Sequence, residues 1–243
     1  MTDKTRAEQT ETSARKNASF FSDHLQSYSR GVSELDSYAN IRSSINEAIR
    51  GTELLLDVGN GGVFDYETAA AQRIVALDLF LDSLPESYRC PENVSLRSGS
   101  ALDIPESNES FDAVLMVMLL HHLVGKTVQE SVNNLRRALS EAYRVLKPGG
   151  QLVIVESCIP KWFFALEKLV FPLAAPIINA SIQHPATLQY PPSFVDQLVT
   201  EATGRSPEVT KIPLGKWVLQ FGWKVPSVMS PVNPYRFVMR KSV

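Results

Sequence analysis

Hydrophobic positions follow two kinds of pattern along this chain, and their alternation predicts an α/β protein. Some apolar stretches are short and nearly continuous, which is typical of parallel strands buried on both faces. Others repeat every three or four residues, which predicts amphipathic helices. The strands predicted from these stretches span residues 54–58, 74–77, 94–97, 113–120, 151–156, 209–212 and 235–239.

Helices are predicted from the spacing of aliphatic residues and from residues that begin or end helices. In residues 37–50, Tyr38 and three isoleucines share one face, and Gly51 fits the helix end. Further helices are predicted at 66–73, 82–88, 127–146 and 194–202, the last with Ser193 as its cap and Gly204 at its end.

A glycine-rich turn between the first two strands carries most of the functional information. Strand, glycine turn, helix, strand and a final acid, Asp78, follow the plan of a nucleotide-binding βαβ unit. The last glycine of the dinucleotide fingerprint G-x-G-x-x-G is missing. Asp57 lies two residues before Gly59, where a carboxylate suits a ligand that carries an amine better than a pyrophosphate.

This turn resembles motif I of the class I S-adenosylmethionine (SAM) methyltransferases, usually Asp-x-Gly-x-Gly-x-Gly. Asp57, Gly59 and Gly61 match that motif. Val63 departs from it, because the family usually has its third glycine there, and Gly62 stands one position early.

Two later stretches are similar to signatures of the same family. Residues 99–105, Gly-Ser-Ala-Leu-Asp-Ile-Pro, and the Ser-Phe-Asp at 110–112 resemble the segment that holds adenine. Residues 144–150, Arg-Val-Leu-Lys-Pro-Gly-Gly, resemble the turn before the fifth strand. The resemblance is to the broad group of ubiquinone/menaquinone-type C-methyltransferases and small-molecule O- and N-methyltransferases.

The resemblance implies a Rossmann-like class I methyltransferase fold, with a mostly parallel seven-stranded sheet, an antiparallel last strand and helices on both faces. It implies SAM as cofactor, S-adenosyl-L-homocysteine as product, and methyl transfer to a small, largely apolar or aromatic acceptor. In the family pattern Asp57 meets the SAM amine, Asp78 the ribose, and Ser100 or Asp103 the adenine amino group. The cofactor-binding residues predicted in this way are Asp57, Gly59, Asn60, Gly61, Asp78, Leu79, Ser100, Ala101, Asp103 and Met116.

Candidate acceptor-side residues follow the fourth strand and occupy the later part of the chain. His121 and His122 stand where ligands bind in such sheets, so each is a candidate general base or acceptor orienter. The alternative is a purely structural role at a helix start. The predicted substrate-binding residues are Tyr28, Trp162, His184, Tyr190, Trp217 and Trp223, and no metal site is predicted.

The expected domain organisation is a disordered leader at 1–17 and one SAM-binding domain at 18–243, in which 18–51 form a helical lid. Segments 158–192 and 213–234 are expected substrate-side insertions. The stretch 161–171 is aromatic and moderately amphipathic, and Pro172 and Pro176 are expected to stop its continuation. Three interpretations of this stretch compete: a lid over an apolar substrate, a homodimer contact, and a membrane-surface anchor.

Composition narrows the functional classes. Lys and Arg total 24 against 26 Asp and Glu, a net charge of −2, so no nucleic-acid partner is expected from charge. Cys90 and Cys158 lie far apart, and the leader lacks an apolar segment, so a cytoplasmic protein is expected, without stable membrane insertion. Two alternatives to methyl transfer are a SAM-binding relative with another reaction and a catalytically silent partner-binding subunit. The glycine spacing disfavours a nicotinamide dehydrogenase.

Overall fold

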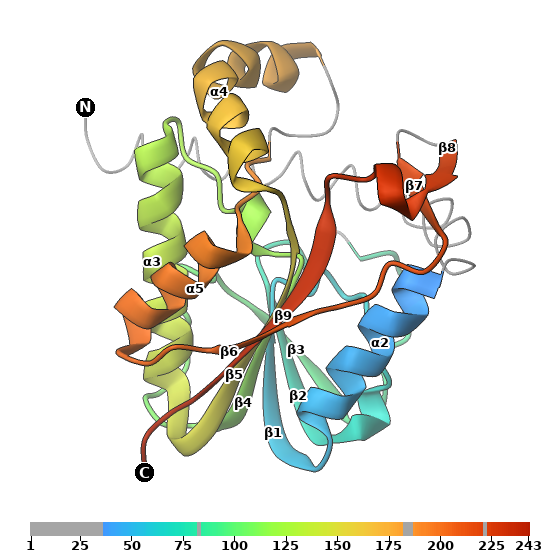
Figure 1. Ribbon diagram of the computed structural model, residues 1–243. Helices are drawn as coiled ribbons and strands as arrows, with labels where there is room; N and C mark the ends of the chain where they lie inside the picture. Colours follow the sequence, from blue (N-terminus) through green and yellow to red (C-terminus); the bar gives the residue numbers. More distant parts are fainter. Residues whose placement is uncertain (1–35, 82–83, 182–186, 221–222) are drawn as a thin grey trace.

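A mostly parallel sheet organises the protein, as the computed structural model shows for residues 36–81, 84–181, 187–220 and 223–243 (Figure 1). Its strands are β1 (Thr52–Val58), β2 (Ala71–Asp78), β3 (Val94–Ser98), β4 (Phe111–Val117), β5 (Leu146–Cys158), β6 (Glu208–Lys211) and β9 (Asn233–Arg240). They lie in the order β3-β2-β1-β4-β5-β9-β6. The last strand of the chain, β9, is antiparallel to both of its neighbours, as predicted.

Helices cover both faces of this sheet, which confirms the predicted fold class. Helix α2 (Asp36–Ile49) lies on one face, and α3 (Val128–Val145) and α5 (Pro192–Thr203) lie on the other (Figure 1). Ile41, Ile45 and Ile49 of α2 are buried in one core cluster, and residues of α3 and α5 are buried in a second. Each fully buried aliphatic side chain stabilises the fold by about 1.5–3 kcal/mol.

Helix α3 was predicted at 127–146 and is one residue shorter at each end. Thr127 is its N-cap and accepts a hydrogen bond from the Glu130 N–H. The helix ends at Val145, directly before β5. Helix α5 ends as predicted at Gly204, in the left-handed conformation, but its N-cap is Pro191 rather than Ser193.

The helix predicted at 66–73 is absent, and this is the main correction to the expected fold. A single 3₁₀ turn, Thr68–Ala70, joins the first two strands, and β2 begins at Ala71. Ala71 and Arg73 pair with β1. The strand ladder therefore takes the residues that a helix would need. The described part of the predicted helix 82–88 is also not helical, and Pro85 within it disfavours a helical residue before it.

Strand ends differ from the predictions on either side of α3. Strand β4 ends at Val117, because Met118 has a positive φ of 49° and the short turn Leu120–His122 follows. Strand β5 begins at Leu146 rather than at residue 151, so it includes the Pro-Gly-Gly turn that was expected to precede it. Helix α4 (Lys161–Ser181) continues through Pro172 and Pro176, against expectation; the fixed φ of proline is itself compatible with a helix.

The long connection 213–234 contains a second, small sheet. Strands β7 (Trp217–Gln220) and β8 (Trp223–Pro226) form an antiparallel hairpin, followed by the turn Ser227–Met229. The Ser227 hydroxyl donates to the Gly215 carbonyl oxygen over 2.6 Å, which closes the base of this segment next to α2 (Figure 1).

Candidate cofactor and acceptor site

The predicted site residues gather at the carboxyl edge of the sheet. Strands β2, β1, β4 and β5 run parallel to one another, so their carboxyl ends reach the same edge. The structure brings Asp57, the glycine turn, Asp78 and His121 to the ends of these strands. This is the edge at which ligands bind in open parallel sheets.

The glycine turn has the backbone that the sequence predicts. Gly59, Gly61 and Gly62 have positive φ values of 76°, 61° and 81°. A side chain at Gly61 would meet no atom within 4 Å, whereas one at Gly59 would meet Leu119 at 2.5 Å. The open side of the turn therefore lies at Gly61, where a ligand can approach the backbone.

Asn60 holds the turn together from inside. Its Nδ2 donates to the Asp57 carboxylate over 2.6 Å and to the Val63 carbonyl over 2.7 Å, and its Oδ1 accepts from the Gly62 N–H over 2.9 Å. The turn is thus rigid before any ligand arrives.

Asp57 is almost completely buried, with 2% of its surface exposed. Its Oδ2 also accepts from the Tyr66 hydroxyl over 2.7 Å. Burial raises the pKa of Asp57 to about 7, although the hydrogen bonds from Tyr66 and Asn60 oppose this shift. The carboxylate at the predicted amine site therefore changes its charge near neutral pH.

Asp78 lies at the end of β2 and reaches back to the glycine turn. Its Oδ2 accepts from the Gly61 N–H over 2.9 Å, and its Oδ1 accepts from the Phe80 N–H over 2.9 Å. Burial raises the pKa of Asp78, and these backbone hydrogen bonds act against the increase. The carboxylate thus borders the open side of the turn, where the sequence places the ribose.

The other predicted cofactor residues divide between the surface and the core. Ser100 and Asp103 form one tight turn after β3, in which the Ser100 hydroxyl accepts from the Leu102 N–H over 3.1 Å. Asp103 is exposed, Ala101 is half-buried and Leu79 is 44% exposed. Met116, by contrast, is fully buried in the core cluster on the side of α3.

His121 forms the shortest contact on the acceptor side. Its Nδ1 lies 2.6 Å from Oε1 of Glu156, and its ring lies 4.1 Å from the ring of His122. Glu156 lies near the end of β5 and has no exposed surface. The sequence reasoning did not identify Glu156. The available signal was an acid that closes an apolar strand, as Asp57 and Asp78 do.

Tyr190 lies beside the end of β5, where it forms a β-bridge with Cys158, although it lies far away in sequence. Its neighbour Leu188 donates its N–H to the His121 carbonyl over 3.1 Å. The Tyr190 ring is buried against Phe164 and Phe194, with ring centres 5.6 and 5.5 Å away. Burial raises the pKa of Tyr190. Tyr190 is therefore packed among aromatic side chains next to the end of β5.

Of the other predicted acceptor residues, the structure describes the side chains of Trp162 and Trp217 alone. Trp162 and Trp217 are 66% and 50% exposed, on α4 and β7. Tyr28 and His184 lie outside the described residues, as does the side chain of Trp223. Within the described ranges, no three His, Cys, Asp or Glu side chains form a metal-binding group, and no helix has the length and hydropathy to span a bilayer.

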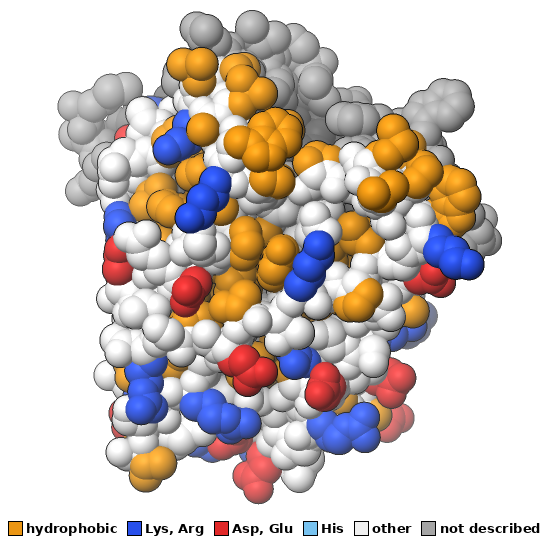
Figure 2. Space-filling model, viewed as in Figure 1, with side chains coloured by type: hydrophobic (Ala, Val, Ile, Leu, Met, Phe, Trp, Pro, Cys, Tyr) orange, Lys and Arg blue, Asp and Glu red, His pale blue; other side chains and the backbone are white. Residues whose placement is uncertain are grey.

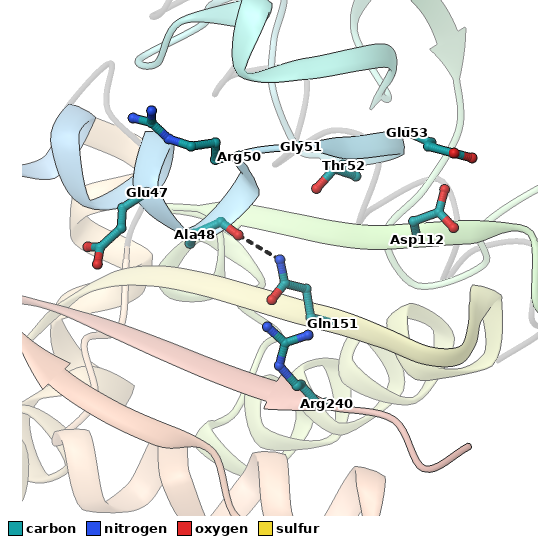
Figure 3. A pocket seen from close by; sticks show the side chains of 9 residues that line it. All are labelled: Glu47, Ala48, Arg50, Gly51, Thr52, Glu53, Asp112, Gln151 and Arg240. Atoms are coloured by element: carbon teal, nitrogen blue, oxygen red, sulfur yellow. Dashed lines mark hydrogen bonds between the residues drawn. The ribbon is translucent and has the colours of Figure 1, made fainter.

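A polar hollow of about 400 Å³ lies at the opposite edge of the sheet (Figure 3). It is lined by the first residues of β1, by Asp112 at the start of β4 and by Arg240 at the end of β9. Gln151 crosses it and donates to the Ala48 carbonyl over 2.6 Å (Figure 3). Acids and arginines both line this hollow, which is remote from the strand ends where the sequence motifs gather.

Comparison with protein families shows that residues 56–154 match the model of the methyltransferase domain. A demethylmenaquinone methyltransferase of Renibacterium salmoninarum is 30% identical over 175 residues, which are 70% of this chain and 65% of that protein. An uncharacterized methyltransferase-like protein of Schizosaccharomyces pombe is 34% identical over 126 residues, 49% of this chain and 45% of that protein. The chain thus spans less than two thirds of the length of these curated relatives.

Solved structures share the fold at low sequence identity. The 1,6-didemethyltoxoflavin-N1-methyltransferase of Burkholderia thailandensis, solved with its acceptor and S-adenosylhomocysteine, has a TM-score of 0.61 and 14% identity, over 95% of this chain and 89% of its own. Human N-acetylserotonin methyltransferase, solved with SAM, has a TM-score of 0.56 and 13% identity, over 92% of this chain and 55% of its own. At these identities the likeness concerns the fold.

Proposed function

Residues 56–154 belong to the class I SAM-dependent methyltransferase family, and from this premise we propose that the protein transfers a methyl group from SAM to a small, largely apolar or aromatic acceptor. The observation that carries the proposal is the position of Asp57, Gly61, Asp78 and His121 at one edge of the sheet. That edge combines groups suited to an amino acid and a sugar with a candidate base.

The described residues fit SAM at four points. Asp57 offers a carboxylate for the amine, and the open side of Gly61 admits the ligand beside the backbone. Asp78 can accept hydrogen bonds from the ribose hydroxyls, and the turn from Ser100 to Asp103 can border adenine. When bound, SAM supplies a methyl group already activated by a positive sulfur.

The acceptor is proposed to lie between His121 and the aromatic residues of α4 and α5. Phe164, Tyr190 and Phe194 form an apolar wall next to the end of β5. The relative from R. salmoninarum is named for demethylmenaquinone, which supports an acceptor with a quinone-like ring. His121 would take the proton that such an acceptor releases, and bound SAM would supply the methyl group.

Helix α4 presents an apolar stripe on the outside of the molecule. Trp162, Leu166 and Leu169 are 66%, 50% and 75% exposed. Figure 2 shows hydrophobic side chains gathered over α4, with lysines among them. The exposure favours a contact outside the chain, with a second copy or a membrane surface, over a lid closed on the site. Sedimentation of the protein alone and with lipid vesicles separates these two contacts.

The test is to measure SAM binding by calorimetry and then to incubate the protein with SAM and a panel of quinones, phenols and aromatic amines. The expected result is saturable binding and formation of S-adenosylhomocysteine with at least one acceptor. Binding without transfer to any acceptor would favour a different reaction on the same cofactor. This different reaction is kept as a second candidate because the helix expected after the glycine turn is absent. If the protein did not bind SAM at all, the remaining candidate would be a catalytically silent partner-binding subunit.

A further inference from the structure

We propose that Glu156 is a positioning residue that fixes the tautomer of His121 and leaves its Nε2 atom as the proton acceptor. This inference rests on the proposed role of His121. It concerns a residue that neither the family motifs nor the sequence pattern assigns, and its evidence is the geometry of one buried carboxylate.

The carboxylate of Glu156 is held from several sides. Its Oε2 accepts from the Leu120 N–H over 2.8 Å, and its Oε1 accepts from the Ser157 N–H over 2.8 Å. The Ser157 hydroxyl donates to Oε1 over 3.3 Å. Glu156 therefore has little freedom to rotate, because both of its oxygens are tied to backbone groups.

These donors determine the direction of the contact with His121. A carboxylate whose two oxygens accept from backbone N–H groups is best satisfied when ionised, and an ionised carboxylate only accepts hydrogen bonds. The 2.6 Å contact then requires the proton on Nδ1 of His121. In a neutral imidazole the other nitrogen, Nε2, is left with its lone pair, which is the atom that a general base uses.

The same contact also stabilises the product of proton transfer. When Nε2 takes a proton, the ring becomes positively charged, and the nearest group is the buried Glu156 carboxylate. An ion pair out of water is stronger than one at the surface, provided that both partners are hydrogen-bonded. His121 keeps 14% of its side chain exposed, whereas the Glu156 side chain has no exposed surface.

Residues 188 and 189 add hydrogen bonds near the pair, one of them to the backbone of His121. The Leu188 N–H donates to the His121 carbonyl, and Gln189 Nε2 donates to the Ser157 hydroxyl over 3.1 Å. Residues 188 and 189 are thus hydrogen-bonded to His121 and to Ser157, the neighbour of Glu156. The competing interpretation is that Glu156 serves only to satisfy the Leu120 and Ser157 N–H groups, in which case the tautomer of His121 would be of no consequence.

The first experiment uses the wild-type protein and needs no activity. Long-range ¹H–¹⁵N NMR of the histidine rings, assigned with the His121→Gln variant, reports which nitrogen carries the proton in the neutral form. The expected result is the Nδ1–H tautomer for His121. The Nε2–H tautomer would overturn the proposal, whether or not the protein methylates any acceptor.

The second experiment compares Glu156→Gln and Glu156→Asp with Glu201→Gln, an exposed glutamate that contacts only Gln197 and Arg136 among the contacts described. We expect Glu156→Gln to lower kcat at least about 10-fold while the Kd for SAM changes less than about twofold. Glu156→Asp should recover part of kcat, and Glu201→Gln should have no effect. Unchanged kcat in folded Glu156→Gln would contradict the proposal; if that variant does not fold, the NMR result decides.

Discussion

The carboxyl edge of the sheet has two halves, one at β1 and β2 and one at β4 and β5, and each contains a buried carboxylate. The two carboxylates obtain their hydrogen bonds in different ways. On the side of β1 and β2, Asp57 is satisfied by Asn60 and Tyr66, three and nine residues later in the chain. On the side of β4 and β5, Glu156 is satisfied by groups that include Leu120 and His121, 36 and 35 residues earlier. The contacts of Asp57 are therefore local in sequence, whereas those of Glu156 exist only once β4 and β5 have paired.

This difference predicts that the two halves can be damaged separately. The residues proposed to bind SAM should act on the affinity for SAM, because SAM binds before the reaction. Acceptor residues act on the rate of the chemical step. A variant that moved both quantities together would indicate that the halves are not independent.

The largest expected effect is on the acceptor side, from His121→Gln. Loss of a general base typically lowers kcat by about 10²- to 10⁴-fold, and SAM affinity should stay within about twofold because His121 is not assigned to the cofactor. Single-turnover rates and calorimetry check the two quantities. His122→Gln, which does not remove the contact with Glu156, is the matched control. A larger loss in His122→Gln than in His121→Gln would reverse the assignment.

On the cofactor side, Asp78→Asn should weaken SAM binding about 10- to 100-fold, because hydrogen bonds to a charged group contribute about 1.5–3 kcal/mol. Glu53→Gln, at the opposite edge of the sheet, should leave the Kd unchanged. Calorimetry gives both values. An unaltered Kd in Asp78→Asn would contradict the proposal that Asp78 binds the ribose. A lower kcat at saturating SAM would show that the two halves of the carboxyl edge do not act independently.

SAM affinity should also depend on pH through Asp57. Its pKa is raised to about 7 in the folded protein, so it is largely neutral below that pH and cannot pair with the amine. The Kd should rise about tenfold for each pH unit below about 7 and level off above it. In Asp57→Asn the dependence should disappear. A flat profile in the wild type would place the amine elsewhere.

The raised pKa of Asp57 has the opposite effect on the stability of the protein without SAM, which it increases at low pH. Because the folded pKa is above the unfolded value, folding stabilises the protonated form. The contribution of Asp57 to the free energy of unfolding is therefore largest below about pH 4 and is lost as the pH rises through about 7. Urea unfolding at several pH values, with Asp57→Asn as the reference, isolates this contribution.

The smallest expected effect comes from Tyr66→Phe. Removing the Tyr66 hydroxyl deletes a hydrogen bond that lowers the pKa of Asp57, so that pKa should rise above its present value of about 7. The pH at which SAM binding levels off should move upward, and the free energy of unfolding should fall by about 1 kcal/mol. Tyr143→Phe, beside Lys241, is the control. An unshifted profile would mean that Tyr66 does not control the charge of Asp57.

Sequence patterns predicted the parts of the molecule that depend on neighbouring residues. The glycine turn, helix α3 and the buried strands all follow from short-range signals, and the structure contains each of them. The sequence did not predict that Ala71 and Arg73 would join β2, because their partners in β1 are 19 residues earlier in the chain. The contact between His121 and Glu156 was missed for the same reason, since two strands must align before it exists.

The carboxylate proposed to bind the ribose, Asp78, already accepts a hydrogen bond from the Gly61 N–H. A ligand that takes this position exchanges one hydrogen bond for another, which makes its net gain modest. The exchange is equally easy in reverse. When the nucleoside leaves, the Gly61 N–H and the Asp78 carboxylate can form their hydrogen bond with each other again. A protein built in this way is suited to letting its spent cofactor go and beginning another round.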